Sequence, residues 1–173
     1  MTMWNAVLWA WGGGALLLLA LWFHQLRSRN ATLVDVGWTL TLAGSGLFYA
    51  AVSPGAAAQR GLVALVAGVW GLRLAWHLIA DRVLGHKPED ARYQNLRAAW
   101  GPRAHLHFLW FYQLQAAAAV ALSIPYASIA ASPSSPPTTV QWAGVALWAA
   151  SILLESLADR QLAAYRRNPA HKG

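Results

Sequence analysis

Five long apolar runs restrict what this chain can fold into. A bilayer core of about 30 Å requires roughly 20 apolar residues in a helix, and each run approaches that length. Helices are favoured because a backbone in lipid must satisfy its own hydrogen bonds. The sequence therefore predicts an all-α, polytopic transmembrane bundle with five spans: Trp4 to Gln25, Leu33 to Val52, Leu62 to Ala80, Leu106 to Ile124, and Val140 to Leu157.

Composition favours a membrane protein over a soluble one. Of the 173 residues, 57% are hydrophobic and only 11% are charged, whereas a soluble domain has about 25% charged residues. The net charge of +7 could indicate nucleic-acid binding. Because the basic residues lie between apolar runs, we expect a bilayer and no nucleic acid as the partner. The absence of cysteine excludes disulfides, thiolate metal sites and cysteine nucleophiles.

Lysine and arginine are distributed unequally between the predicted loops. Two follow the first span, five lie in residues 81–106 and four lie in the tail, all on one side of the membrane. The opposite side has Arg60, and Arg73 lies within a span. Because basic loops face the cytoplasm, we expect an integral membrane protein with its N-terminus outside and its C-terminus in the cytoplasm.

Residues 81–106 are polar and basic, and we expect a short cytoplasmic helix in them, between the third and fourth spans. Pro88 suits a first helical position, Glu89 and Asp90 complement the helix dipole in the first turn, and Gly101-Pro102 ends the helix. Pro125 and the segment 132–139 predict a turn-rich connection. The chain, residues 1–173, is interpreted as a single integral membrane domain without internal repeats.

Polar residues within the third span indicate a candidate site. Arg73, His77 and Asp81 recur at i, i+4 and i+8, so on a helix they form one stripe that leads into the basic loop. A charge at membrane depth costs about 2.5–3.5 kcal/mol, which makes a functional role the default interpretation. We predict that Arg73 and His77 are catalytic residues. The open alternative is a structural ion pair with Asp35 or Glu155.

Asp35 is the one acidic residue of the second span and lies in its first turn. One interpretation places it near the membrane interface, where it complements the helix dipole. The other is a carboxyl group that faces a cavity and, when burial keeps it protonated, donates a hydrogen bond. On the fourth span, Tyr112 and Gln113 are expected to hydrogen-bond across helices or to line a pocket.

The last predicted helix has a polar face that crosses from membrane depth into the cytoplasm. Ser151, Glu155 and Asp159 recur at i, i+4 and i+8, and Arg166 shares their face. The histidines have no metal-ligand spacing with acidic partners, so we expect no metal site. The sequence contains no GxGxxG motif, Walker loop or nucleophile elbow.

Several segments, in their order and spacing, resemble one membrane-protein family. They are LVDVGW (33–38), WGLRLAWHL (70–78), EDARY (89–93) with Leu96 and Arg97, FYQLQ (111–115) with Pro125, and ADRQL (158–162) with Arg166. Together they are similar to the uncharacterised bacterial membrane branch of the steroid 5α-reductase-like superfamily. The resemblance covers nearly the whole chain from about residue 30.

The resemblance implies a helical reductase that transfers hydride from NADPH to an enone-type double bond of a lipid or steroid-like substrate. It also implies the inner membrane of a bacterium. In that family an acid on the second helix helps to polarise the substrate carbonyl, a catalytic role that falls on Asp35. Several arginines could hold the cofactor phosphates bidentately. By position, the resemblance assigns cofactor binding to Arg82, Arg92, Tyr93, Arg97, Asp159 and Arg166.

Typical family members continue beyond the matching region with a segment of the type Arg-His-Pro-Asn-Tyr-Phe and further membrane helices. This sequence resembles their amino-terminal two-thirds, so we do not expect it to be catalytically competent alone. Two other classes stay open. One is a membrane enzyme that methylates lipids or prenyl-cysteine from S-adenosylmethionine. The other is a noncatalytic membrane module that assembles with another chain or a small-molecule carrier.

Overall fold

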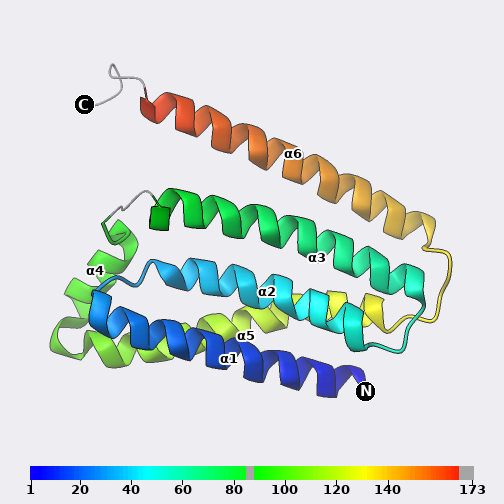
Figure 1. Cartoon of the computed structure of the whole chain (residues 1–173), viewed down its shortest axis with the longest axis horizontal. Coiled ribbons are helices and arrows are strands. Elements are labelled where there is room, and N and C mark those ends of the chain that lie inside the picture. Colours follow the sequence, from blue (N-terminus) through cyan, green and yellow to red (C-terminus); the bar gives the residue numbers. More distant parts are fainter. Residues whose placement is uncertain (85–87, 168–173) are drawn as a thin grey trace. The chain divides into compact units, whose positions relative to one another are not determined.

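The computed structural model describes residues 1–84 and 88–167, with the backbone alone at positions 83, 166 and 167. These residues form helices and no strand, which confirms the all-α prediction (Figure 1). The elements are α1 (Met3–Ser28), α2 (Leu33–Val52), α3 (Ala57–Leu78), the π-helix η1 (Ile79–Leu84), α4 (Ala91–Trp100), the 3₁₀-helix η2 (Gly101–Arg103), α5 (Ala104–Ala130) and α6 (Thr139–Arg167).

Four helical segments in the described part of the chain are long and apolar enough to cross a membrane: Met3–Ser28, Ala57–Arg82, Ala91–Ala130 and Thr139–Tyr165. The predicted span Leu33 to Val52 coincides with α2, which is not among these four. Eleven of its 20 residues are buried. Its buried small and polar residues, Gly37, Thr39, Thr41, Ser45 and Gly46, therefore face protein.

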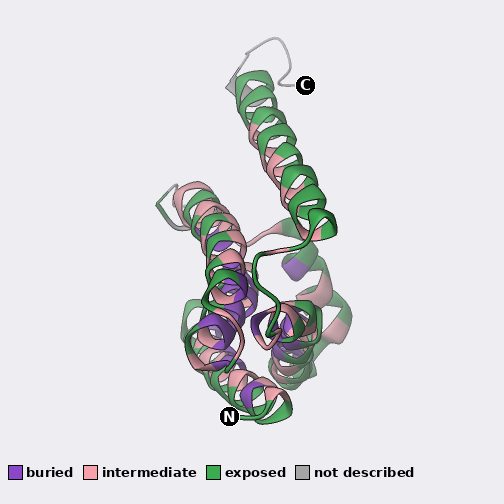
Figure 2. Ribbon diagram, turned by 90° about the vertical axis from the view of Figure 1, so that its right-hand side faces the viewer, coloured by how far each residue is buried: buried purple, intermediate pink, exposed green. Residues whose placement is uncertain are grey.

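The chain divides into two compact units, Met1–Ser135 and Pro136–Gly173. The first unit contains α1 to α5, and its buried residues lie on the facing sides of these helices (Figure 2). The second unit contains α6, and none of the described side chains of α6 is buried. The predicted fifth span and its continuation as a polar helix are thus one uninterrupted helix.

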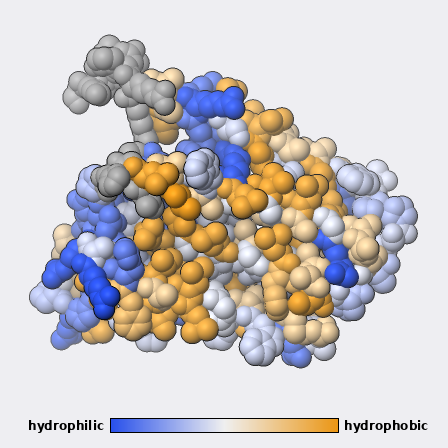
Figure 3. Space-filling model, viewed as in Figure 1, coloured by the Kyte–Doolittle hydropathy of each residue, from blue (hydrophilic) through white to orange (hydrophobic). Residues whose placement is uncertain are grey.

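Within the first unit, α2 packs against α1, α3 and α5. Successive helices run in opposite directions, so the end of α1, the start of α2, η1, α4 and the start of α5 meet at one end (Figure 1). The described parts of the predicted basic loops after the first and third spans, with Arg27, Arg29, Arg82, Arg92, Arg97 and Arg103, therefore lie at the same end. Figure 3 shows hydrophilic side chains gathered there, at the lower left, beside a largely hydrophobic middle.

Two clusters of buried side chains form the core of this unit. The cluster near the basic loops includes Val34, Tyr93, Phe108 and Tyr112. The cluster at the opposite end includes Tyr49, whose buried hydroxyl lies 3.0 Å from the Ser123 hydroxyl. Both clusters join α1 and α2 to α5, so α5 takes part in the core at both ends of the unit.

The short helix α4 begins later than the sequence predicted. It starts at Ala91, so Pro88 precedes it instead of occupying its first position. Asp90 is the N-cap, and its side chain accepts a hydrogen bond from the Arg92 backbone N–H at 2.9 Å. Aspartate is strongly preferred there because its oxygen satisfies a free N–H of the first turn. Gly101 ends α4 as predicted, with a φ of 55°.

The turn predicted at Pro125 is wrong, because α5 continues through this residue to Ala130. Proline lacks the N–H that closes a helical turn and normally interrupts a helix. Membrane helices tolerate it when side chains and neighbouring helices satisfy the backbone groups that it releases. Next to it, the Ser123 hydroxyl donates to the Val120 carbonyl at 2.7 Å. The connection to α6 therefore begins only after Ala130.

Gly14 allows α1 and α2 to approach closely. A Cβ atom at Gly14 would lie 2.4 Å from Cγ2 of Thr41, whose hydroxyl is held by the Gly37 carbonyl at 2.8 Å. Gly12 and Gly13 have no atom within 4 Å of the corresponding position. Of these three consecutive glycines, Gly14 is the one at which an added Cβ would clash.

We expect Gly14→Ala to lower the free energy of unfolding relative to Gly13→Ala by about 1–3 kcal/mol, because overpacking displaces Thr41. Both substitutions gain the same helix propensity, so their difference reports the contact between α1 and α2. Thermal unfolding in detergent measures it. Equal stability of the two variants would contradict the close packing.

Candidate functional site

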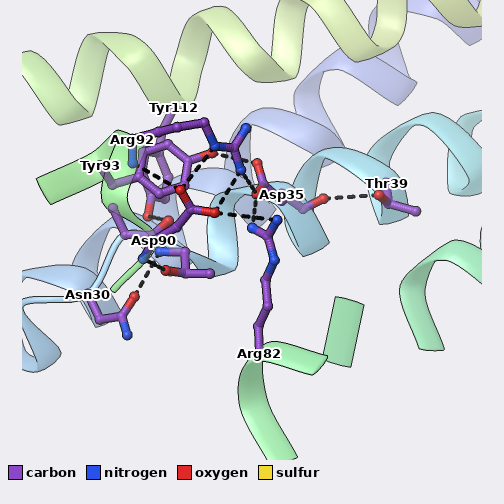
Figure 4. Close-up of polar contacts among 10 residues, drawn as sticks. Asn30, Asp35, Thr39, Arg82, Asp90, Arg92, Tyr93 and Tyr112 are labelled. Carbon is purple, nitrogen blue, oxygen red and sulfur yellow. Dashed lines mark hydrogen bonds and ion pairs between the residues drawn. The ribbon is translucent and has the colours of Figure 1, made fainter. Parts of the chain in front are cut away.

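The Asp35 carboxylate is the centre of a polar cluster at the end of the first unit (Figure 4). Its Oδ1 atom accepts a hydrogen bond from the Tyr93 hydroxyl at 2.5 Å. Its Oδ2 atom accepts from Arg92 Nη2 at 3.0 Å and from Arg82 Nη1. The carboxylate thus joins α2 to η1 and α4. We call Asp35, Arg82, Asp90, Arg92 and Tyr93 the Asp35 cluster.

Arg82 reaches Asp35 from a π-helical turn. After α3 ends at Leu78, the chain widens into η1, and the Ile79 N–H bonds to the carbonyls of both Ala75 and Trp76. A π-turn changes the direction in which later side chains point, and such turns are frequent at functional sites. The π-turn therefore breaks the regular α-helical spacing of the predicted stripe Arg73, His77 and Asp81 before the chain reaches Arg82.

Asp90 is the second carboxylate of the Asp35 cluster. It accepts hydrogen bonds from Arg92 Nε at 3.0 Å and Nη2 at 3.1 Å, and lies 3.5 Å from Arg82 Nη2. Its backbone N–H donates to the Thr32 hydroxyl at 2.9 Å, which fixes the loop before α4 to the start of α2. Two arginines thus face two carboxylates, and this arrangement compensates charges that are partly removed from water.

Arg97 belongs to a neighbouring ion pair. It donates to the two carboxylate oxygens of Glu89 at 2.8 and 3.2 Å, and its guanidinium lies 4.7 Å from the centre of the Phe108 ring. Glu89 also accepts the Ala31 N–H at 2.7 Å. A bidentate pair over an aromatic face holds a guanidinium in a defined orientation. Arg97 therefore lies beside the Asp35 cluster without belonging to it.

The structure brings together four of the residues predicted for the site: Asp35, Arg82, Arg92 and Tyr93. The other two predicted catalytic residues lie on α3, where Arg73 is half-buried and His77 is exposed. Their catalytic roles stay predictions. The alternative role of both residues, a structural ion pair with Asp35 or Glu155, likewise stays a prediction.

The remaining predicted cofactor residues lie on α6, in the second unit. Asp159 is half-buried there, and the side chain of Arg166 lies outside the described residues. The roles that the resemblance assigns to both stay predictions. In the first unit, Gln113 hydrogen-bonds across helices as expected, donating to the Ala15 carbonyl at 3.3 Å. The Tyr112 hydroxyl donates to the Ala31 carbonyl at 3.1 Å.

Asp90 is the functional residue that sequence reasoning missed. We expected it to complement the dipole of a helix that already contained it. The sequence does contain a signal for its role, because Arg92 follows Asp90 by two residues. An aspartate at an N-cap can bond to the helix backbone and also bind an arginine in the first turn. The capping role turns the Asp90 side chain toward Arg92 and so toward Asp35 (Figure 4).

The helices and the Asp35 cluster define a helical membrane protein with a carboxylate, arginine and tyrosine site at the end of its bundle. A family model described as "Protein of unknown function (DUF1295)" matches residues 21–173. The chain belongs to this DUF1295 family. No curated protein and no solved structure matches the chain significantly.

The hydrogen bond from Arg92 holds the pKa of Asp90 below its ordinary value of 3.8. A carboxylate with a lowered pKa stabilises the folded state while it is ionised. Its contribution is therefore present above about pH 4 and is lost as the pH falls through the lowered pKa.

Asp90→Asn keeps an oxygen for the cap of α4 but removes the charge. We expect the unfolding temperature of the wild type to exceed that of Asp90→Asn by a constant amount between about pH 7 and 5, and the difference to shrink by about pH 3. Thermal unfolding over this range tests the ion pairs. A difference that does not vary with pH would mean that the charge of Asp90 contributes nothing.

Proposed function

We propose that this protein is a membrane-embedded, NADPH-dependent reductase that acts on an enone-type double bond of a lipid or steroid-like substrate. The observation that carries the proposal is the 2.5 Å hydrogen bond between the Tyr93 hydroxyl and Asp35, beside two arginines. The resemblance to the steroid 5α-reductase-like superfamily supplies the cofactor and the class of substrate. The bacterial inner membrane, with a cytoplasmic C-terminus, is the proposed location.

The Tyr93 hydroxyl is suited to polarise a carbonyl group. The residue is only 3% exposed, and its ring packs edge-on against Phe111 with 6.0 Å between centroids. A phenolic O–H is both donor and acceptor. It can turn its proton from Asp35 toward a substrate oxygen while the ring stays in place. A fixed donor aimed at an oxygen that gains negative charge lowers the barrier to reduction.

Asp35 acts in this proposal as an acceptor that positions Tyr93. In the described structure the Asp35 carboxylate accepts hydrogen bonds from Tyr93, Arg82 and Arg92. We therefore propose that Tyr93, in place of Asp35, donates the hydrogen bond to the substrate carbonyl. The two arginines keep the carboxylate in place when the Tyr93 proton turns toward the substrate.

NADPH, when bound, supplies the hydride. Its phosphates require accessible cationic donors, and the side chain of Arg92 is 61% exposed although it also bonds to Asp35 and Asp90. Arg82 and Arg97 are the further basic residues proposed for the cofactor in this unit, and Asp159 and Arg166 those proposed on α6. The donor set suits a phosphorylated dinucleotide, because guanidinium groups bind phosphate oxygens in pairs.

We expect Tyr93→Phe to lower kcat about 100-fold, because it removes the polarising O–H and keeps the packed ring. Asp35→Asn should likewise reduce turnover while the affinity for NADPH stays nearly intact. The measurement is NADPH oxidation with a steroid 4-en-3-one as the probe, in a protein that includes the carboxyl-terminal segment of typical family members. Tyr112→Phe is the matched control, since its buried hydroxyl donates to the Ala31 carbonyl instead of Asp35. Turnover lost equally in both tyrosine variants would remove the role of Tyr93.

Cofactor binding is tested separately from turnover. We expect NADPH, and not S-adenosylmethionine, to raise the unfolding temperature of the protein. Arg166→Ala should weaken NADPH binding much more than substrate binding, whereas Arg167→Ala, which removes the same charge from the next position, should not. Stabilisation by S-adenosylmethionine alone would favour the methyltransferase. Stabilisation by neither molecule, even with the carboxyl-terminal segment of typical family members present, would favour the noncatalytic module.

A further inference from the structure

A polar pocket separate from the Asp35 cluster lies where the end of α1, the end of α4 and the start of α5 meet. It has a volume of about 310 Å³, within the range of roughly 300–1,000 Å³ that is usual for ligand sites. Its polar residues are Gln25, Arg29, Arg97 and His105, and Leu26 and Pro102 contribute apolar surface. We call this cavity the Gln25 pocket.

Gln25 supplies an unused donor to this pocket. The residue is 1% exposed, and its Oε1 atom accepts a hydrogen bond from Arg97 Nη2 at 3.3 Å. Its Nε2 atom is buried and has no hydrogen-bond partner among the described residues. Arg97 fixes the amide orientation, because a guanidinium can only donate. A buried donor without a partner is energetically unfavourable, so a ligand with an acceptor oxygen would be stabilised here.

The charges around the Gln25 pocket favour an anion. Arg29 is the C-cap of α1 and is exposed, with a φ of 54° at a position where glycine is usual. The Glu89 carboxylate offsets the positive charge of Arg97, with which it forms an ion pair. It does not offset the positive charge of Arg29. The pocket combines guanidinium donors with a buried amide N–H. A phosphate group matches this set, since it presents several acceptor oxygens and negative charge.

We propose that the Gln25 pocket binds a phosphate group, carried either by an anionic lipid or by free phosphate. The pocket lies at the end of α1, a candidate membrane span, where lipid headgroups meet a membrane protein. This inference goes beyond the proposed reductase. Arg97 lines this pocket and is also proposed for the cofactor, whereas Gln25 and Arg29 have no part in the proposed reductase. Variants of Gln25 and Arg29 therefore test this inference separately from the reductase.

The test uses the protein in maltoside detergent, which contains no phosphate. Isothermal titration calorimetry is carried out with dihexanoyl phosphatidic acid and, separately, with inorganic phosphate. We expect Gln25→Leu and Arg29→Gln each to weaken binding about tenfold, because each removes a donor to the phosphate. Arg27→Gln is the matched control: it removes an equal charge from the same helix end, outside the pocket, and should change Kd less than about twofold.

The two ligands distinguish the sources of the phosphate. Tight binding of phosphatidic acid with weak binding of inorganic phosphate assigns a lipid headgroup, and equal binding assigns free phosphate. Equal weakening by Arg27→Gln and Arg29→Gln would reveal general charge attraction and overturn the proposal. Displacement of the lipid by NADPH, or binding of neither probe, would also overturn it. Thermal unfolding checks the folding of Gln25→Leu, and Arg29→Gln tests the site through an exposed residue.

Discussion

The partly buried Asp35 carboxylate imposes the constraint on which the end of the bundle depends. A charge removed from water is tolerated only with partners, and loss of one partner leaves it uncompensated. Its partners come from η1 and α4, so three segments that are distant in sequence must meet for the charge to be satisfied. The same bonds orient the Tyr93 hydroxyl. One electrostatic requirement therefore both closes this end of the fold and arranges the site proposed for catalysis.

The central helix α2 can bury many polar side chains because they bond to its own backbone. The hydroxyls of Thr39, Thr41 and Ser45 donate to carbonyls four residues earlier, at 3.0, 2.8 and 2.7 Å. Such local bonds satisfy polar groups without partners on other helices. At the far end, Arg60 donates to the Ala50 carbonyl at 2.7 Å and covers the end of α2. The helix therefore buries these hydroxyl groups inside the bundle with their hydrogen bonds satisfied.

The basic end of the molecule contains two adjacent sites of different character. Glu89 and Asp90 are consecutive, yet Glu89 holds Arg97 beside the Gln25 pocket and Asp90 holds Arg92 beside Asp35. The segment before α4 therefore assigns each arginine to one site. The excess of positive charge, from which we predicted the membrane orientation, forms two sets of positioned guanidinium groups in three dimensions.

The sequence by itself determined the helical class, the bounds of α2 and the gathering of the basic loops at one end, because run length and helix period are local properties. It also indicated Asp35. Packing decided the rest. A π-turn directs Arg82 to Asp35, Asp90 caps α4, and α5 passes through Pro125. The Gln25 pocket exists only where three helix ends meet. Such features depend on contacts between segments distant in sequence, and no spacing along one helix encodes them.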